Sequence, residues 1–340
     1  MNIELLEKLC LINGTSGDEG KVRDFIISEI SGHCEYTVDP LGNIIAYKKG
    51  RSVAKNKVMV SAHMDEVGMI VTSVKSDGTL TVSPVGGVDP RVVIGRPVRI
   101  GDNDIVGVIG AKAVHNLSAD EKKTAPKFSA LYADIGAADK AAAEKLVNLG
   151  DRVHFDSEFL RFGDGFVKGK AIDDRFGCCV MIELIQSDIE YDCVFTFVVQ
   201  EEVGLRGART AAYTVAPDFA LVLEATTAAD IPLASGEKRC CELGKGAVVS
   251  YMDRSTIYDR ELYDISKAAA SEQGIGWQTK TMVAGGNDSG AIHISGGGVR
   301  TMAISAPCRY LHSPSCTVKI SDLEDCQRLA EIMIEKMCSL

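Results

Sequence analysis

The sequence has little of what several large classes of protein require. Aromatic residues make up 6% of the 340 residues, with one tryptophan, and none of the 11 cysteines belongs to a C-x-x-C pair. Lysine and arginine number 37 against 47 aspartates and glutamates, which gives a net charge of −10. No uninterrupted apolar run approaches the ~18 residues of a membrane-spanning helix. These shortages argue against a zinc ribbon, a disulfide framework, a nucleic-acid-binding surface and a membrane protein.

The cysteines and the first residues both favour a reducing compartment. The number of cysteines is odd, and some are adjacent (Cys178 and Cys179, Cys240 and Cys241), which suits small buried side chains in a reducing cytosol. The segment MNIELLEKLCLING at the amino terminus carries acids where a signal peptide has a basic region followed by an apolar stretch. We therefore expect a cytoplasmic protein whose partners include neither nucleic acid nor a membrane.

The remaining composition, 46% hydrophobic and 25% charged, is that of a globular chain with room for about two domains of ~150 residues. Helical and strand-like segments alternate up to about residue 72 and again from residue 163, which is typical of a three-layer α/β/α domain. Between 73 and 162, short β-type runs such as 91–94 are broken by glycine and proline, with one alanine-rich helix expected over 137–149. We predict an α/β domain in two pieces, 1–72 and 163–340, split by a mostly β insert at 73–162.

Two helices are expected to begin with capping boxes, in which a serine and a glutamate three residues later bond to each other's backbone N–H groups. Ser16 and Glu19 precede apolar residues at helical spacing. Ser321 and Glu324 stand in the same relation near the carboxyl terminus. Both pairs are therefore interpreted as helix starts.

Ligand-type residues cluster where strands are expected to end, which is where α/β sheets place their sites. Five segments carry them: SAHMDE (61–66), KAIDDR (170–175), FVVQEEVG (197–204), LVLE (221–224) and YLHS (310–313). His63 and Asp65 would lie on one face of an extended chain, so that the carboxylate could accept one ring N–H and leave the other nitrogen for a metal. The pair Asp173 and Asp174, taken alone, is interpreted as a helix N-cap.

Together the five segments supply two histidines and three or four carboxylates without a thiolate, a set that suits zinc, cobalt or manganese. With one bridging carboxylate, these ligands divide evenly between two ions. The other histidines are given ordinary roles: His33 and His154 are expected at the surface and His293 in a glycine-rich turn region. His115 lies in a polar loop of the insert, where a partner subunit could use it.

The sequence also resembles a known family over nearly its whole length, insert included. The segments AHMDEVG, KAIDDRFG, VVQEEVGLRGA, LEAT, GGNDSGAIH and RYLHS occur in the same order in the cytosolic tetrahedral aminopeptidases, the glutamyl-aminopeptidase-like di-metal peptidases of the MH clan. The resemblance implies a three-layer metallopeptidase domain interrupted by a dimerisation domain. It further implies dimers that assemble into a tetrahedral dodecamer.

Carried over to this chain, the resemblance implies that Asp173 bridges two metal ions. His63 and Glu224 would complete one ion, and Glu202 and His312 the other. Glu201 would be the general base, and Asp65 the partner of the first histidine. The chain departs from the family's usual pattern at two positions, since Glu224 stands where Asp is common and Asn287 where Thr often precedes Asp288.

We therefore expect a metal-dependent aminopeptidase that removes the first residue of a peptide. Two divalent ions (Zn, Co or Mn) lower the pKa of a water molecule from 15.7 towards ~7 and polarise the scissile carbonyl, while Glu201 moves the proton. The free α-amino group would be held by a metal or by an acid such as Glu202 or Asp288.

Three other functions remain open. A di-metal amidohydrolase that removes acyl groups from amino acids could use nearly the same ligands. A non-catalytic assembly protein could have kept the scaffold, although every expected ligand retains a competent side chain. Glycoside hydrolysis also uses paired carboxylates, but the two histidines and the few aromatics make it the weakest alternative. The sequence leaves the preferred first residue and the identity of the metal undetermined.

Overall fold

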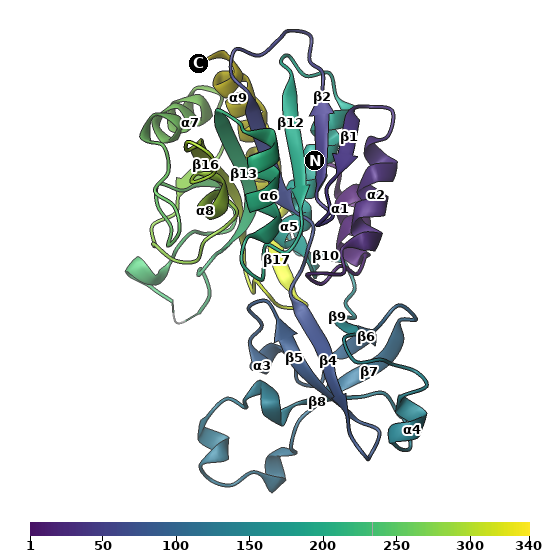
Figure 1. Cartoon of the computed structure of the whole chain (residues 1–340). Helices are drawn as coiled ribbons and strands as arrows, with labels where there is room; N and C mark the ends of the chain where they lie inside the picture. The colour runs from purple at the N-terminus through teal and green to yellow at the C-terminus, as the bar shows by residue number, and fades with distance from the viewer. Residues whose placement is uncertain (233) are drawn as a thin grey trace.

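A computed structural model describes residues 1–232 and 234–340 of the chain (Figure 1). It has a larger body built on one sheet and a smaller body built on a β-barrel, which lies below the sheet in Figure 1. Both chain ends belong to the larger body, where the amino-terminal helices and the carboxyl-terminal helix pack on the same apolar core. The insert therefore leaves the larger body and returns to it.

The larger body contains an eight-stranded mixed sheet. In spatial order its strands are β1 (Glu35–Val38), β2 (Ile44–Lys48), β12 (Cys193–Val198), β3 (Val58–His63), β13 (Phe219–Thr227), β16 (Arg300–Cys308), β14 (Ala247–Val249) and β15 (Trp277–Thr279). The four central strands β12, β3, β13 and β16 run parallel, and β2 and β14 flank them in the antiparallel direction. The carboxyl ends of the four parallel strands consequently meet at one edge of the sheet.

Helices cover both faces of this sheet (Figure 1). One face carries α1 (Ile3–Leu11), α2 (Gly20–Ile30), α5 (Ile172–Gln186), α7 (Arg260–Glu272) and α9 (Ile320–Ser339), and the other carries α6 (Arg206–Val215) and α8 (Ser289–Ile292). Strand β3 shows why: Val58, Val60 and Ala62 join the apolar cluster of the first face, whereas Met59 joins that of the second. The predicted three-layer arrangement is confirmed.

The smaller body is a closed six-stranded barrel with its own apolar cluster. Around the barrel its strands are β4 (Gly68–Val74), β5 (Leu80–Val85), β8 (Tyr132–Asp134), β7 (Ile105–Gly110), β6 (Pro97–Ile100) and β9 (Arg152–Phe155). Closure removes free strand edges from a unit that is too small to bury them otherwise. A mostly β insert was predicted and is confirmed; the domain boundaries at 72/73 and 162/163 stay predictions.

Short elements complete the fold. They are β10 (Leu160–Phe162), β11 (Phe166–Gly169) and β17 (Cys316–Lys319), which form a three-stranded sheet, together with α3 (Pro90–Val93), α4 (Lys140–Ala143), η1 (Val114–Asn116), η2 (Glu121–Lys123), η3 (Phe128–Ala130) and η4 (Gly236–Lys238). The pairing of β11 with β17 places the start of α5 beside the residues that follow β16. Within the described residues, no helix combines the length and the apolar character needed to cross a membrane.

Two sequence predictions in the insert were wrong. The run 91–94 is largely the short helix α3, because the side chain of Asp89 accepts the N–H of Arg91 and Pro90 stands at the first helical position. The alanine-rich segment is helical only over α4, and the chain continues in turns. Beyond it Val147 is buried in the barrel's apolar cluster, whereas Leu146 and Leu149 are exposed, so little of this stretch is held against the core.

Both predicted capping boxes were also wrong. Helix α9 begins at Ile320, so that Ser321 lies inside it, and no side chain caps it at Lys319. Helix α2 begins at Gly20 with Glu19 at its N-cap position, and the side chain of Glu19 makes no capping hydrogen bond. The side chains of Ser16 and Glu19 bond elsewhere, as described below.

Candidate metal centre

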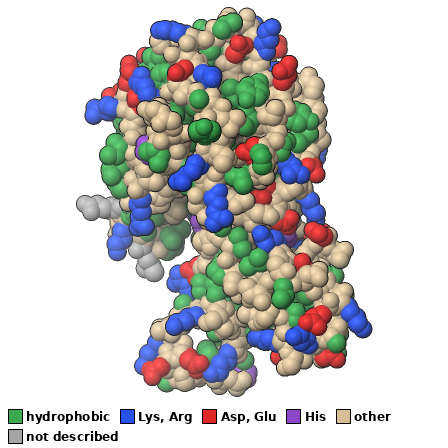
Figure 2. All heavy atoms as spheres, viewed as in Figure 1, with side chains coloured by type: hydrophobic (Ala, Val, Ile, Leu, Met, Phe, Trp, Pro, Cys, Tyr) green, Lys and Arg blue, Asp and Glu red, His purple; other side chains and the backbone are tan. Residues whose placement is uncertain are grey.

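The residues singled out from the sequence meet at the carboxyl edge of the parallel strands, facing the barrel. Strand β3 ends at His63, and the chain leaving β12 reaches Glu201 and Glu202 within four residues. His312 follows β16, and Glu224 lies inside β13, which runs three residues further than expected. A cleft of about 890 Å³ opens here, lined by residues of both bodies, including Gly87 from the barrel side. Figure 2 shows acidic and basic side chains interspersed over one face of both bodies.

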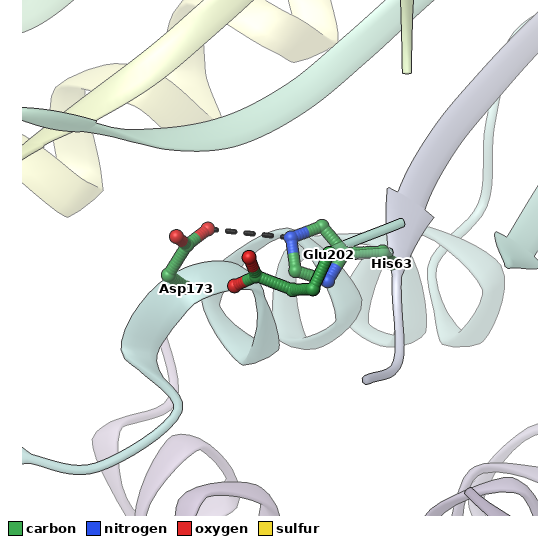
Figure 3. A group of neighbouring side chains, drawn as sticks. All are labelled: His63, Asp173 and Glu202. Carbon is green, nitrogen blue, oxygen red and sulfur yellow. Dashed lines mark ion pairs between the residues drawn. The ribbon is translucent and has the colours of Figure 1, made fainter. Parts of the chain in front are cut away.

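Asp173 stands between the two histidines. Its Oδ1 lies 3.3 Å from Nε2 of His63, and its Oδ2 lies 3.4 Å from Nε2 of His312. Figure 3 shows its carboxylate pointing towards the ring of His63, with Glu202 beside the pair. Each carboxylate oxygen therefore faces a different imidazole, which is the arrangement that a bridging ligand requires.

The remaining expected ligands lie on either side of Asp173. Oε1 of Glu224 is 3.5 Å from Nε2 of His63, and Oε1 of Glu202 is 3.3 Å from Nε2 of His312. Two groups offer ligand atoms that all lie within 4.8 Å of one another: His63 with Asp173 and Glu202, and His63 with Asp174 and Glu224. The spacing of these atoms fits divalent cations held by a mixed nitrogen and oxygen set.

The electrostatics of the site also fit cations. Although burial raises the pKa of Asp173, the facing imidazoles of His312 and His63 hold it below its usual range. Burial and the charge of Asp173 raise the pKa of Glu224 well above its usual range, and burial raises that of Glu202 to about 7. Oδ1 of Asp173 is buried and has no hydrogen-bond partner among the described residues. Carboxylates held this close without compensation are costly, and a bound divalent ion removes that cost.

Glu201 and Asp65 lie next to this group. Burial raises the pKa of Glu201 well above its usual range, and the charges of Asp288 and Glu202 raise it further. The ring Nδ1 of His63 is 3.0 Å from the main-chain oxygen of Asp65 and 3.6 Å from its Oδ1. The carboxylate of Asp65 accepts the backbone N–H groups of Glu201 at 3.0 Å and Glu202 at 3.2 Å. It thus fixes the backbone of the adjacent glutamates.

Asp288 is buried, and neither of its carboxylate oxygens has a hydrogen-bond partner among the described residues. Burial raises its pKa to about 7. The neighbouring Asn287 bonds to the hydroxyl of Tyr258 and accepts the N–H of Ser289, so its side chain supports the local turn.

Asp174 makes the bond to the backbone three residues later that the N-cap interpretation expects, but its contact with β3 was not expected. Its Oδ2 accepts the backbone N–H of His63 at 3.3 Å, and its Oδ1 accepts that of Gly177 at 2.9 Å. It therefore joins the end of β3 to the start of α5. Two adjacent acids were the only signal for it, and they do not reveal which one faces a ligand.

The surface position expected for His154 was also wrong. This histidine lies on β9, and its side chain is buried. Its Nδ1 forms a 2.9 Å hydrogen bond with the hydroxyl of Thr15, and its Nε2 lies 3.5 Å from Oδ2 of Asp18. His115 is exposed in η1.

A known protein family matches most of the chain. The family model described as M42 glutamyl aminopeptidase matches residues 42–329. The chain belongs to this family. A putative aminopeptidase of Acetivibrio thermocellus is 39% identical over 339 residues, covering 98% of each chain. The family is one of metal-dependent enzymes that remove residues from the amino terminus of peptides, and this aminopeptidase shares that activity.

Two further similar proteins carry a named specificity or assembly of their own. Lysyl aminopeptidase of Pyrococcus furiosus is 31% identical over 344 residues, covering 98% of this chain and 97% of its own length. A solved structure of the TET1 peptidase of Pyrococcus horikoshii, described as assembling into a tetrahedron or a large octahedral shell, superposes with a TM-score of 0.85. That protein is 35% identical, over 97% of this chain and 98% of its own.

Proposed function

We propose that this aminopeptidase uses two divalent ions, Zn, Co or Mn, bridged by Asp173. His63 and Glu224 would complete one site, and Glu202 and His312 the other. The observation that carries the proposal is the position of Asp173, whose two oxygens face the two histidines at 3.3 and 3.4 Å. When bound, such ions supply Lewis acidity that lowers the pKa of a water molecule and polarises the scissile carbonyl.

Glu201 is the proposed general base. It lies next to Glu202 but is absent from both groups of clustered ligand atoms, so its carboxylate is available for proton transfer. It takes a proton from the attacking water and returns it to the leaving amine. Burial raises its pKa well above the usual range, which favours return of the proton to the leaving amine.

Asp288 is proposed to hold the α-amino group of the substrate. A buried carboxylate without a hydrogen-bond partner suits an ammonium group, since the pair would satisfy both charges. Replacement of the free amine by an amide would remove that charge, so this site favours peptides over N-acyl amino acids.

The cleft is proposed to favour an acidic first side chain. Lys238, Arg254 and Lys280 line it, and none of them has an ion-pair partner among the side chains that the structure describes. Unpaired cations in a confined space attract carboxylates more strongly than they do at an open surface.

The aminopeptidase is further proposed to act in the cytoplasm as a homo-oligomer, with barrel-mediated dimers assembled into a tetrahedral dodecamer. The assembly described for the TET1 peptidase supports this, and so do the exposed apolar residues Val106 and Val108 on barrel strand β7. The 11 unpaired cysteines are consistent with a reducing compartment.

The decisive experiment replaces Glu201 by Gln. We expect a loss of about 100- to 10,000-fold in kcat on chromogenic aminoacyl substrates, because general acid–base catalysis contributes about 10²–10⁴-fold. Metal content, measured by elemental analysis, should be unchanged. The matched control is Glu272→Gln on the exposed end of α7. Near-normal turnover by the Glu201 variant would overturn the assigned role.

The same assay separates the alternative functions. Free-amino substrates and their N-acetylated counterparts are compared with the wild-type enzyme reloaded with each metal. Preference for the N-acetylated series would identify a deacylase, and absence of both activities would favour the assembly protein.

A further inference from the structure

The loop between α1 and α2, residues 14–19, touches the metal centre although no expected ligand lies in it. The hydroxyl of Ser16 donates a 2.6 Å hydrogen bond to Oδ2 of Asp65. Oε1 of Glu19 accepts the backbone N–H of Gln200 at 3.2 Å and that of Gly17 at 2.7 Å. Both side chains are buried, so neither bond competes with bulk water. Of the two residues that resemble a capping box, Ser16 thus contacts the carboxylate of Asp65 and Glu19 contacts the backbone of Gln200.

The bond from Ser16 acts on a carboxylate that has other partners. Asp65 is fully buried, and its two oxygens also accept the backbone N–H groups of Glu201 and Glu202. Ser16 is the hydroxyl donor that fixes the orientation of this carboxylate. A rotated Asp65 would release one or both glutamate N–H groups.

The bond to Glu19 acts one residue earlier in the same segment. Gln200 has φ +56°, in the left-handed region that a non-glycine residue adopts only when its surroundings impose it. Gln200 changes the direction of the chain after β12 and so sets the orientation of Glu201 and Glu202. Glu19 holds its N–H in that conformation.

The loop is also anchored on its far side. Thr15 bonds to His154 of β9, and the guanidinium of Arg152 donates to the main-chain oxygen of Ser16 at 3.2 Å. The N–H of Ser16 donates to the main-chain oxygen of Glu66, which follows β3. Barrel, first loop and strand end therefore form one connected unit.

We propose that Ser16 and Glu19 are positioning residues that hold the segment Gln200–Glu202 against the metal centre. Ser16 acts through Asp65, and Glu19 acts through the N–H of Gln200. Neither residue contacts the expected ligand atoms, so both affect the orientation of Glu201 and Glu202 and take no part in the reaction itself. The inference rests on the proposed roles of Glu201 and Glu202.

The test compares Ser16→Ala with Ser28→Ala. Ser28 donates its hydroxyl to Phe25 on the exposed side of α2, so its replacement also deletes one hydroxyl, but far from the site. For Ser16→Ala we expect kcat to fall about 10–100-fold with KM changed less than about threefold, because loss of an outer partner of a metal site typically has that effect. The affinity for Zn²⁺, titrated against a chromophoric chelator, should fall about tenfold or more. Ser28→Ala should change neither quantity.

Glu19 supplies an independent pair of variants. Gln at this position keeps an oxygen that can accept both N–H groups, whereas Ala does not. We expect Glu19→Gln to retain kcat and Zn²⁺ affinity within about threefold and Glu19→Ala to lose about tenfold or more in each. Circular dichroism of each metal-free variant verifies folding, and this pair decides the question if Ser16→Ala fails to fold.

Equal behaviour of Ser16→Ala and Ser28→Ala, or of the two Glu19 variants, in both kcat and Zn²⁺ affinity would overturn the proposal. A wild-type protein without aminopeptidase activity would instead overturn the proposed function. The Zn²⁺ titrations would then still report whether the loop positions the ligands.

Discussion

Three buried aspartates surround His63 at the edge of the sheet. Asp65, Asp173 and Asp174 all approach atoms of His63 within 3.6 Å. Asp65 orients the adjacent glutamates, Asp173 stands between the histidines, and Asp174 joins β3 to α5. The same side chain can play all three roles because its two oxygens accept in different directions. What distinguishes the three residues is the partner that the fold presents to each.

Glu19 predicts a pH dependence of stability. Burial, with a smaller contribution from the charge of Asp65, raises its pKa to about 7 from the usual 4.5. Between these values the folded protein retains a proton that the unfolded chain has released, so stability falls as pH rises through this window, by up to about 1.4 kcal/mol per pH unit. Glu19→Gln has no proton to lose and should flatten the decline.

Urea unfolding of the metal-free protein at pH 5, 6, 7 and 8 measures this decline. The slope of free energy against pH should be shallower for Glu19→Gln than for the wild type and for the control Glu272→Gln. If the free energy of unfolding changed with pH in the same way for all three proteins, the pKa of Glu19 would be the same in the folded and unfolded states.

Ser16 and Glu19 also show what local patterns miss. Their spacing matched a capping box, and α2 does begin at Gly20. Ser16, however, bonds to Asp65, 49 residues away, and Glu19 bonds to Gln200, 181 residues away, as well as to its neighbour Gly17. A capping pattern describes only neighbours within one turn. His154 was misplaced for the same reason, since its partner Thr15 belongs to the other body.

Among the elements, the buried strands were predictable and the short helix of the insert was not. Strands β3 and β12 are buried throughout, and their exits into His63 and Glu201 identified the site edge from sequence alone. Helix α3 has four residues and depends on one Asp side chain, so the run 91–94 carried no helical period to detect. The position of Asp173 between the two histidines follows from the packing of α5 against β3, which no spacing within one segment encodes.

That packing yields a prediction at Gly177. A methyl group here would meet Oδ2 of Asp174 at 2.6 Å and Cβ of Ala62 at 2.8 Å, so α5 must move away from β3. We expect Gly177→Ala to lower the free energy of unfolding by about 1–3 kcal/mol, as overpacking does, and to weaken Zn²⁺ binding because the adjacent Asp173 shifts with the helix.

Urea denaturation without metal and a Zn²⁺ titration measure the two effects. The control is Gly297→Ala, where the added methyl would meet nothing within 4 Å, and where we expect a change within about 0.5 kcal/mol. If Gly177→Ala bound Zn²⁺ with the wild-type affinity, the packing of α5 against β3 would not determine metal affinity, and this part of the prediction would be wrong.

The two bodies of the molecule meet at the cleft, and acidic and basic side chains occupy different parts of the cleft lining. The acidic residues among the expected ligands lie at the edge of the sheet, and three cationic residues line the same cleft: Lys238, Arg254 and Lys280. The net charge of −10 gave no indication of these cations, because composition sums over the surface and the site alike. Only the fold shows that the chain segments carrying these three residues meet there.

Lys280 is the half-buried member of the three, and it predicts substrate preference. A carboxylate about 4 Å from its ammonium group gains roughly 1 kcal/mol in water and about 4 kcal/mol at an effective dielectric constant of 20, and a cleft lies between these limits. The enzyme should therefore cleave glutamyl p-nitroanilide faster than the uncharged, nearly isosteric glutaminyl p-nitroanilide. Lys280→Gln should reduce that ratio of kcat/KM about tenfold, with the glutaminyl rate unchanged.

The matched control is Lys267→Gln on α7, where the ammonium lies over the ring of Tyr263 at 5.1 Å and outside the cleft. Its glutamyl-to-glutaminyl ratio should equal that of the wild type. Raising the ionic strength from about 0.05 to about 0.5 M should lower the wild-type ratio towards that of Lys280→Gln, because salt screens charges that water can reach. If Lys280→Gln keeps the wild-type ratio at every salt concentration, Lys280 does not interact with the acidic side chain of the substrate. Arg254 is then the next cation to replace.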